Sequence, residues 1–294
     1  MNNTTNVNTK NLTSLAQTFL NSTSDKERAI IRGVVSSSMK KLEFKTGFSA
    51  LKNLGISYLL GRNSSSKMMK GIKQNYDSYV LYLSASNNSG FDLCSFASKF
   101  CRDICLVESG RTMMEKQDGK IHTSRLKKTW LLEFNRAHFD KILQYEIDKA
   151  YKRNLKTNIA YCIRLNGTSD CEFNSIIESN NVQFYDYTKN PEHVINASQN
   201  HHHTFSFSGS NIVLCKQLIK QDINIAVPVL KSDFSRILSE FRQVYNGDET
   251  DLRFLDKMKG GICLLSVKGR HKDISPFLLD FEGFKALYSK LGLN

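Results

Sequence analysis

The sequence predicts an α/β protein: a partial or irregular (β/α) barrel of mainly parallel strands, preceded by an N-terminal helical extension. Short runs of aliphatic and aromatic residues alternate with amphipathic segments from residue 79 onward. Alternation of this kind implies parallel strands joined by right-handed helical crossovers. Polar residues directly follow the strand ends, which is where α/β proteins build their sites. A doubly wound open sheet is the second choice.

The length and composition predict a globular chain with a large core. The chain has 294 residues, of which 40% are hydrophobic and only three are prolines. This length suits one barrel-sized domain or a core with a smaller appendage. We expect an N-terminal helical region over residues 1–70 with a mobile tip, and an α/β barrel-like domain over residues 71–294.

The N-terminal region carries three amphipathic segments. Apolar residues recur at helical spacing near 12–20, over 25–42 and over 48–60, and a polar loop follows at 62–67. Basic residues exceed acidic ones in this region. It is a candidate docking element for nucleic acid or a partner protein, or else a solvated helical cap.

After this region, strands and helices are predicted in turn. One long helix is expected over 124–154. Its apolar face is formed by Leu126, Trp130, Phe134, Ile142 and Tyr145, and the basic residues that lie largely elsewhere are Arg125, Lys127, Lys128, Arg136 and Lys141. The expected strands lie near 79–85, 158–165, 182–186, 203–207, 223–230 and 261–267, with a seventh near 242–245. The expected shorter helices lie near 173–180, 191–198, 210–221 and 232–243.

The charge of the chain points to a polyanionic partner. A formal net charge of +13 and a pI near 9.4 raise the local concentration of polyanions and make their binding salt-dependent. Nucleic acid, DNA or RNA, is therefore the expected partner; the alternative is that lysines merely solvate helix faces. No apolar stretch approaches the ~20 residues of a membrane span, and the first residues lack a secretory signal. We expect a cytoplasmic protein with no membrane partner.

Three cysteines follow the first predicted strand of the α/β region. Cys94, Cys101 and Cys105 are candidate thiolate ligands for zinc or an iron–sulfur cluster, with His122, Cys162 or Cys171 as a fourth ligand. The alternative is that they are structural thiols. Seven cysteines in a reducing compartment would seldom form disulfides.

Carboxylates at other strand ends form the second candidate site. Asp170 and Asp186 follow neighbouring predicted strands, and Asp248 and Asp251 lie in a later acidic cluster. Converging carboxylates suit Mg²⁺ or Mn²⁺, and such ions activate water against phosphodiesters. Two lysines would neutralise the phosphate of the phosphodiester. Four polar residues at strand ends are candidate cofactor-binding groups. The alternative is that these residues are turn and cap residues. The lysines are Lys189 and Lys268, and the four polar residues are Asn166, Ser169, Thr188 and Ser208.

A run of three histidines offers a minor alternative. His201 and His203 would share one face of a strand and hold a metal beside a nucleophilic tyrosine, Tyr185 or Tyr187. The alternative is a polar strand start.

Several motifs, in order, resemble a phage- and plasmid-borne family called gene product 88. They are Phe91-Asp92-Leu93-Cys94, Arg164 to Asp170, Phe184 to Lys189, Gly247 to Asp256 and Val267-Lys268-Gly269. The resemblance covers about residues 79–280 and implies a mobile-element origin. The cysteine loop also resembles that of radical S-adenosylmethionine enzymes, although six and three residues separate its cysteines, a wider spacing than in that family.

These observations predict a phage- or plasmid-type nucleic-acid-binding protein that acts as a metal-dependent processing or replication-associated enzyme. One alternative is a non-catalytic DNA- or RNA-binding protein. A second alternative is an iron–sulfur enzyme of the radical type.

Overall fold

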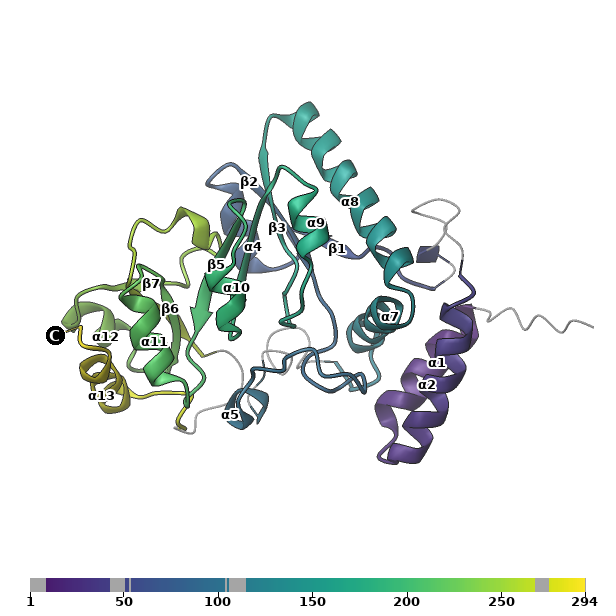
Figure 1. The fold of residues 1–294 in the computed structure, drawn as a ribbon, viewed down its shortest axis with the longest axis horizontal. Helices are drawn as coiled ribbons and strands as arrows, with labels where there is room; N and C mark the ends of the chain where they lie inside the picture. Colours follow the sequence, from purple (N-terminus) through teal and green to yellow (C-terminus); the bar gives the residue numbers. More distant parts are fainter. Residues whose placement is uncertain are drawn as a thin grey trace, which may run out of the picture.

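The computed structural model describes residues 9–42, 51–52, 54–103, 105, 115–267 and 275–293. Eight strands form one sheet, with helices along the chain between them (Figure 1). The strands are β1 (Leu60–Arg62), β2 (Tyr76–Leu81), β3 (Ala160–Arg164), β4 (Gln183–Thr188), β5 (His201–Ser206), β6 (Ile225–Val229), β7 (Val244–Asn246) and β8 (Ile262–Ser266). The helices are α1 (Thr9–Asn21), α2 (Asp25–Met39), α4 (Ser66–Ile72), α5 (Lys99–Asp103), α7 (Lys120–Phe134), α8 (Arg136–Thr157), α9 (Asn174–Glu178), α10 (Pro191–Ile195), α11 (Ile212–Ile219), α12 (Phe234–Glu240), the 3₁₀ turn η2 (Arg253–Leu255) and α13 (Phe281–Leu291).

The sheet is open and mostly parallel. Its order is β1-β2-β3-β4-β5-β6-β8-β7, and only the β1–β2 pair is antiparallel. Mixed α/β architecture and parallel pairing are confirmed, and β7 confirms the seventh predicted strand near 242–245. A barrel is not confirmed, because β1 and β7 remain edges and no pairing joins them in the described part of the chain.

Most helices cover one face of the sheet. Strand residues alternate between faces, and Ile163 and Phe184 join one apolar cluster with residues of α7, α8 and α9. Further along the same face, Phe205 and Val227 pack with α11, α12 and α13. The opposite face, here called the η2 face, holds Cys162 and Tyr185 against Leu252 and Phe254. The η2 face is therefore covered by the segment 247–256 and, at Gly71, by α4, which approaches Leu252.

The N-terminal helices share a core with the sheet. Helices α1 and α2 pack on α7, where the rings of Phe19 and Trp130 meet edge to face at 5.4 Å. Leu12 and Val35 belong to the same buried cluster as Ile163 of β3. The boundary expected at residue 70 falls inside α4. Within the described residues, no helix is long and apolar enough to cross a membrane.

The single long helix expected over 124–154 is wrong, because the chain breaks at Asn135. Asn135 has φ −150° and ψ 67°, and its side-chain oxygen accepts a hydrogen bond from the backbone N–H of His138. Its amide nitrogen donates to the carbonyl oxygens of Met39 and Leu42 at 2.9 and 3.3 Å. Asparagine competes well for backbone groups, which favours a cap over a helix interior. One helix therefore becomes α7 and α8.

The burial of two lysines of α7 also differs from expectation. Lys127 and Lys128 are 3% and 5% exposed rather than on a solvated face. Their ammonium groups donate to the carbonyl oxygens of Gly55 and Leu59 at 2.9 and 3.0 Å. These acceptors come from a segment far away in the sequence, so helical periodicity alone could not reveal them.

Candidate functional site

Asp170 joins the ends of β3 and β4. It accepts hydrogen bonds from the Thr188 hydroxyl at 2.7 Å and from the backbone N–H of Lys189 at 2.8 Å. His193 Nδ1 lies 3.3 Å from the same carboxylate, which raises the pKa of His193 above its usual value. The carboxyl ends of the two strands thus bring together three residues expected at the site: Asp170, Thr188 and Lys189.

Asp186 is buried where β3 and β4 diverge. One carboxylate oxygen accepts from the backbone N–H of Asn166 at 2.8 Å, and the other lies 3.0 Å from His201 Nε2. Arg164 Nε is 3.9 Å away. With 1% of its surface exposed, Asp186 is enclosed by protein groups.

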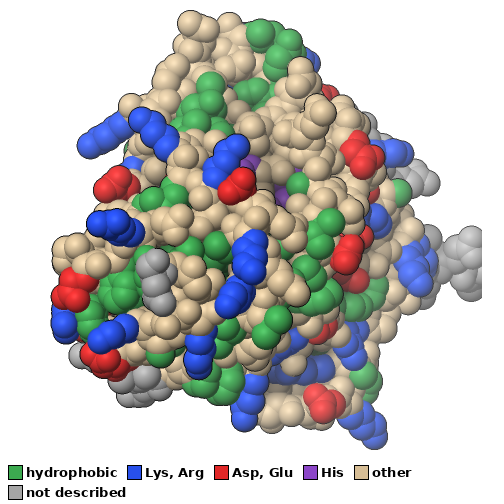
Figure 2. Space-filling model, turned by 60° about the vertical axis from the view of Figure 1, so that its left-hand side comes forward, with side chains coloured by type: hydrophobic (Ala, Val, Ile, Leu, Met, Phe, Trp, Pro, Cys, Tyr) green, Lys and Arg blue, Asp and Glu red, His purple; other side chains and the backbone are tan. Residues whose placement is uncertain are grey.

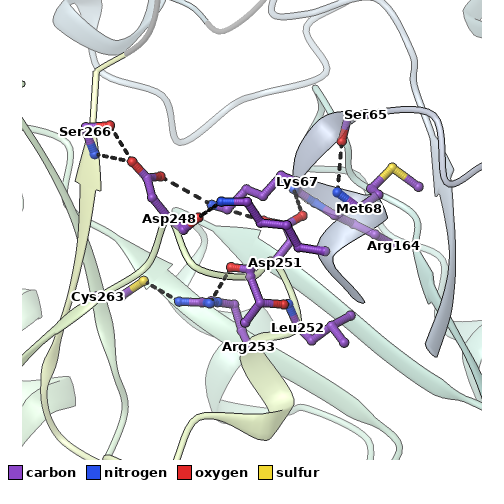
Figure 3. A network of polar contacts seen from close by, with 12 residues as sticks. Ser65, Lys67, Met68, Arg164, Asp248, Asp251, Leu252, Arg253, Cys263 and Ser266 are labelled. Carbon is purple, nitrogen blue, oxygen red and sulfur yellow. Dashed lines mark hydrogen bonds and ion pairs between the residues drawn. The ribbon is translucent and has the colours of Figure 1, made fainter. Parts of the chain in front are cut away.

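Asp248 and Asp251 belong to a network on the η2 face (Figure 3). Lys67 of α4 lies between them, 3.7 Å from Asp248 and 3.4 Å from Asp251. Asp251 also accepts from Arg164 Nη1 at 3.0 Å, and Asp248 accepts from Ser266. Burial would raise the pKa of Asp251, but Arg164 and Lys67 lower it to about 2.

The four aspartates therefore form ion pairs and hydrogen bonds with the protein instead of converging on an open centre. In the described ranges, no group of three or more His, Cys, Asp or Glu side chains is arranged to hold a metal ion. Lys268, expected to neutralise a phosphate, lies outside the described residues.

The cysteine loop lies beside the end of β4. Burial raises the pKa of Cys94 to about 11, so its thiol is protonated at neutral pH. Burial alone would lower the pKa of Lys189, but Cys101, within hydrogen-bonding reach of its ammonium group, and Asp170 raise it. Cys105 lies close enough to interact electrostatically with Cys94. Of the three cysteines expected to bind a metal, Cys94 and Cys101 are thus neighbours of Lys189, and Cys105 is a neighbour of Cys94.

The expected cofactor-binding residues hold the loops together. The side-chain oxygen of Asn166 accepts from the Ser169 hydroxyl and the backbone N–H of Cys171, at 2.9 and 2.8 Å. The carbonyl oxygen of Ser208 accepts from the Ser98 hydroxyl at 2.6 Å, which links the end of β5 to the cysteine loop. These contacts give Asn166, Ser169 and Ser208 a structural role.

The histidine pair and the tyrosines lie on opposite faces. His201 and His203 lie on the helical face with ring centroids 3.8 Å apart. Tyr185 pairs in register with His202, and Tyr187 with Thr204, so both tyrosines point to the η2 face. The expected metal site with an adjacent tyrosine nucleophile is therefore wrong, because alternation along β4 separates its parts.

Sequence reasoning missed three cations of the η2 face. Arg164, Lys67 and Arg253 bind the acidic cluster, and Arg253 is only 1% exposed. Arg164 was visible within a motif, and an arginine inside an otherwise apolar strand was the available signal. No such signal marked Lys67, because its partners Asp248 and Asp251 lie in a loop more than 180 positions later in the chain.

The exposed side of α8 carries a basic and aromatic surface. Tyr145, Lys149, Lys152 and Lys156, here called the α8 stripe, are all exposed and recur at helical spacing on one side. The Lys149 ammonium lies 5.9 Å from the Tyr145 ring centroid. Asp148 is the exposed acid beside them, and it accepts from Gln144. On the face that Figure 2 shows, by contrast, Lys and Arg are interspersed with Asp and Glu.

One comparison with known proteins identifies a relationship. Residues 58–275 match the model of a family described as gene product 88. No curated protein and no solved structure matches the chain significantly. The likeness to radical S-adenosylmethionine enzymes is therefore not supported.

Proposed function

The protein belongs to the gene product 88 family, and we propose that it binds nucleic acid through the sugar–phosphate backbone at the α8 stripe. The observation that carries the proposal is the row of three exposed lysines beside an exposed tyrosine on one side of α8. A net charge of +13 adds a general attraction for polyanions.

The geometry of the stripe suits a phosphate chain. Lys149, Lys152 and Lys156 span about 10 Å along the helix axis at ~1.5 Å per residue. Their ammonium groups release condensed counterions when they meet phosphates, which supplies affinity without base recognition. Helix α8 is anchored by Phe139, Ile142 and Ile147, which are buried in the main core, so the lysines extend from a rigid support.

The exposed aromatic ring of the stripe favours a single strand. Tyr145, beside Lys149, is 40% exposed. Bases of an unpaired strand stack on exposed aromatic rings, whereas duplex bases are already stacked on one another. We therefore propose single-stranded DNA or RNA as the preferred ligand.

Nucleic-acid cleavage is not part of this proposal. Metal-dependent cleavage needs carboxylates with free oxygen positions, and Asp170, Asp186 and Asp251 each bind two or more protein groups. If the wild type cleaves nucleic acid with Mg²⁺ or Mn²⁺ and the Asp251→Asn variant does not, the protein would be an enzyme as well as a binding protein.

The test is a fluorescence-anisotropy titration with single-stranded and duplex DNA and RNA at several salt concentrations. The triple variant Lys149→Glu/Lys152→Glu/Lys156→Glu should bind at least tenfold more weakly and lower the salt slope by about 2 to 3. The matched control is Lys220→Glu/Lys285→Glu/Lys290→Glu, which changes three other exposed lysines on or beside α11 and α13.

The control makes the outcomes distinct. Equal losses in both variants would mean that only net charge matters and would overturn the assignment to α8. Unchanged binding in the α8 variant would overturn it as well, and wild-type protein without salt-dependent binding would overturn the function itself.

A further inference from the structure

Polar atoms on the η2 face are buried without partners. Arg253 Nε, Tyr187 Oη, Thr204 Oγ1, His202 Nε2 and Arg164 Nε have no solvent contact and no hydrogen-bond partner among the described residues. Thr204 is 0% and Arg253 1% exposed. Asp186 Oδ1, 3.9 Å from Arg164 Nε, is too distant to accept a hydrogen bond.

These side chains surround one place. Tyr187 and Thr204 are register partners on β4 and β5, and the Arg164 guanidinium lies 4.8 Å from the Tyr187 ring centroid. Arg253 of η2 is close enough to Tyr187 and His202 to affect the pKa of both. The segment that contains η2 thus closes over the ends of β3, β4 and β5.

Leaving several buried polar atoms without partners would cost free energy comparable to the net stability of a domain. Water or a ligand must therefore bind them. Two of the atoms, the arginine Nε groups, only donate hydrogen bonds, and the two hydroxyls donate as well as accept. This set favours an occupant that presents acceptors.

The charges around this place are balanced. Lys67, Arg164 and Arg253 pair with the carboxylates of Asp248, Asp251 and Asp256, and Lys70 donates to the backbone carbonyl oxygen of Asp248. Because Asp186 also lies beside Arg164, the four cations are matched by four carboxylates, and the preference for an anion rests on the unpartnered donors.

The available donors favour a tetrahedral anion over a carboxylate. Arg253 has both terminal nitrogens engaged, by Cys263 Sγ at 2.8 Å and by the carbonyl oxygen of Thr250. Its Nε is the one guanidinium nitrogen without a partner among the described residues, so Arg253 does not present two free nitrogens side by side to a carboxylate. Separate donors from Arg253, Tyr187 and Thr204 instead suit an ion with several oxygens.

We propose that the η2 face binds a phosphate group, either as inorganic phosphate or as part of a small phosphorylated molecule, between Arg164, Arg253, Tyr187 and Thr204. This site is distinct from the α8 stripe and does not rest on the nucleic-acid proposal. Phosphate would satisfy donors that the fold leaves buried and would stabilise the closed segment.

Calorimetric titration with inorganic phosphate at constant ionic strength tests the proposal, with chloride and acetate for comparison. We expect saturable phosphate binding and a phosphate-dependent rise in the unfolding temperature. Thr204→Val and Tyr187→Phe should each weaken phosphate binding at least tenfold. In phosphate-free buffer both should remain as stable as wild type or become more stable, because each deletes an unpartnered hydroxyl.

Tyr245→Phe is the matched control. It removes a tyrosine hydroxyl of β7 that already has a partner, Asp256, at 2.7 Å. It should lower stability and leave phosphate affinity unchanged. Equal phosphate affinity in Thr204→Val, Tyr187→Phe and wild type would overturn the site, as would stabilisation by chloride or acetate equal to that by phosphate.

Two further measurements separate the sources of phosphate and the two proposals. Saturation by inorganic phosphate alone identifies the free ion, and at least tenfold tighter binding of a nucleoside monophosphate identifies a phosphorylated molecule. The α8 triple variant should keep its phosphate affinity. A failure of nucleic-acid binding would therefore not contradict the phosphate site on the η2 face. Loss of phosphate binding in that variant would overturn the separate site.

Discussion

Arg164 and Asp251 form a buried ion pair, 3.0 Å between Nη1 and Oδ2, across 87 positions of the chain. The pair joins β3 to the segment that follows β7. Since Asp186 also lies 3.9 Å from Arg164 Nε, one guanidinium connects the end of β4 with the η2 face.

Removing both partners of this pair should cost less than the two single removals added together. Arg164→Met leaves the Asp251 carboxylate buried and should lower the free energy of unfolding by about 3 to 5 kcal/mol. The double variant Arg164→Met/Asp251→Asn should lose clearly less than the sum of the single variants. Urea unfolding measures all three, and an additive result would mean that the two side chains are not coupled.

Acid should destabilise the protein through the histidine strand. Burial, followed by neighbouring histidines, lowers the pKa of His203 to about 2, and burial with Arg253 nearby lowers that of His202 to about 4. A depressed folded pKa means that the unfolded chain binds more protons. The contribution of these histidines to stability is therefore complete above the usual histidine pKa of 6.5, and it is lost as the pH falls toward 4 and then 2.

His203→Gln isolates this effect. It should reduce the slope of unfolding free energy against pH below 6.5 by about 1.4 kcal/mol per unit. His193 has a raised pKa, so its contribution is lost above 6.5 instead and does not mask the result. Urea titrations from pH 4 to 7 give the slopes, and parallel profiles for variant and wild type would contradict the prediction.

Lys128 should cause an alkaline pH dependence. Burial lowers its pKa to about 8 from the usual 10.5, so the folded state releases its proton first and its contribution to stability rises between pH 8 and 10.5. The wild type should therefore gain stability relative to Lys128→Met as the pH rises from 8 to 10.5. Unfolding at pH 7.5, 9 and 10 measures it, and a constant difference would mean that the ammonium is not desolvated.

Removing metals should leave nucleic-acid binding unchanged. The proposed binding at the α8 stripe uses ammonium groups, which need no metal. We expect equal affinity before and after treatment with a chelator, measured by anisotropy. Loss of binding on chelation would implicate an ion, and iron, sulfide and zinc analysis of anaerobically purified Cys94→Ser and wild type would then locate it.

The aromatic part of the stripe should matter for single strands alone. Tyr145→Ala, in which an exposed ring is removed, should weaken single-strand binding by about 1 to 3 kcal/mol if a base stacks there. Duplex affinity should change far less. Equal losses for the two ligands would mean that the ring only positions Lys149.

The sequence predicted the strands better than their assembly. Alternating apolar runs located the parallel strands, and the shared edge of β3 and β4 brought Asp170 to Thr188 and Lys189 as expected. The same patterns could not decide between a barrel and an open sheet, because closure depends on whether the edge strands β1 and β7 pair.

The site on the η2 face depends on contacts that local patterns do not record. Lys67 meets Asp248 and Asp251 only because α4 packs near the loop after β7. The separation of Tyr185 from His201 follows from strand parity and was predictable once the register was known. Tyr145 was expected on the apolar face of one long helix, but it is 40% exposed, because Asn135 starts a second helix with a different orientation.

Asn135 makes the stability of the α/β unit depend on the N-terminal helices. Asn135 ends α7 with its backbone N–H, caps α8 with its side-chain oxygen, and donates from its side-chain nitrogen to the carbonyl oxygens of Met39 and Leu42 at and just after the end of α2. A chain that lacks residues 1–42 would leave the Asn135 amide facing water, and Trp130 would lose its contact with Phe19. Attempts to isolate the sheet as a minimal fragment should therefore retain α1 and α2, since they complete the interior of the unit they precede.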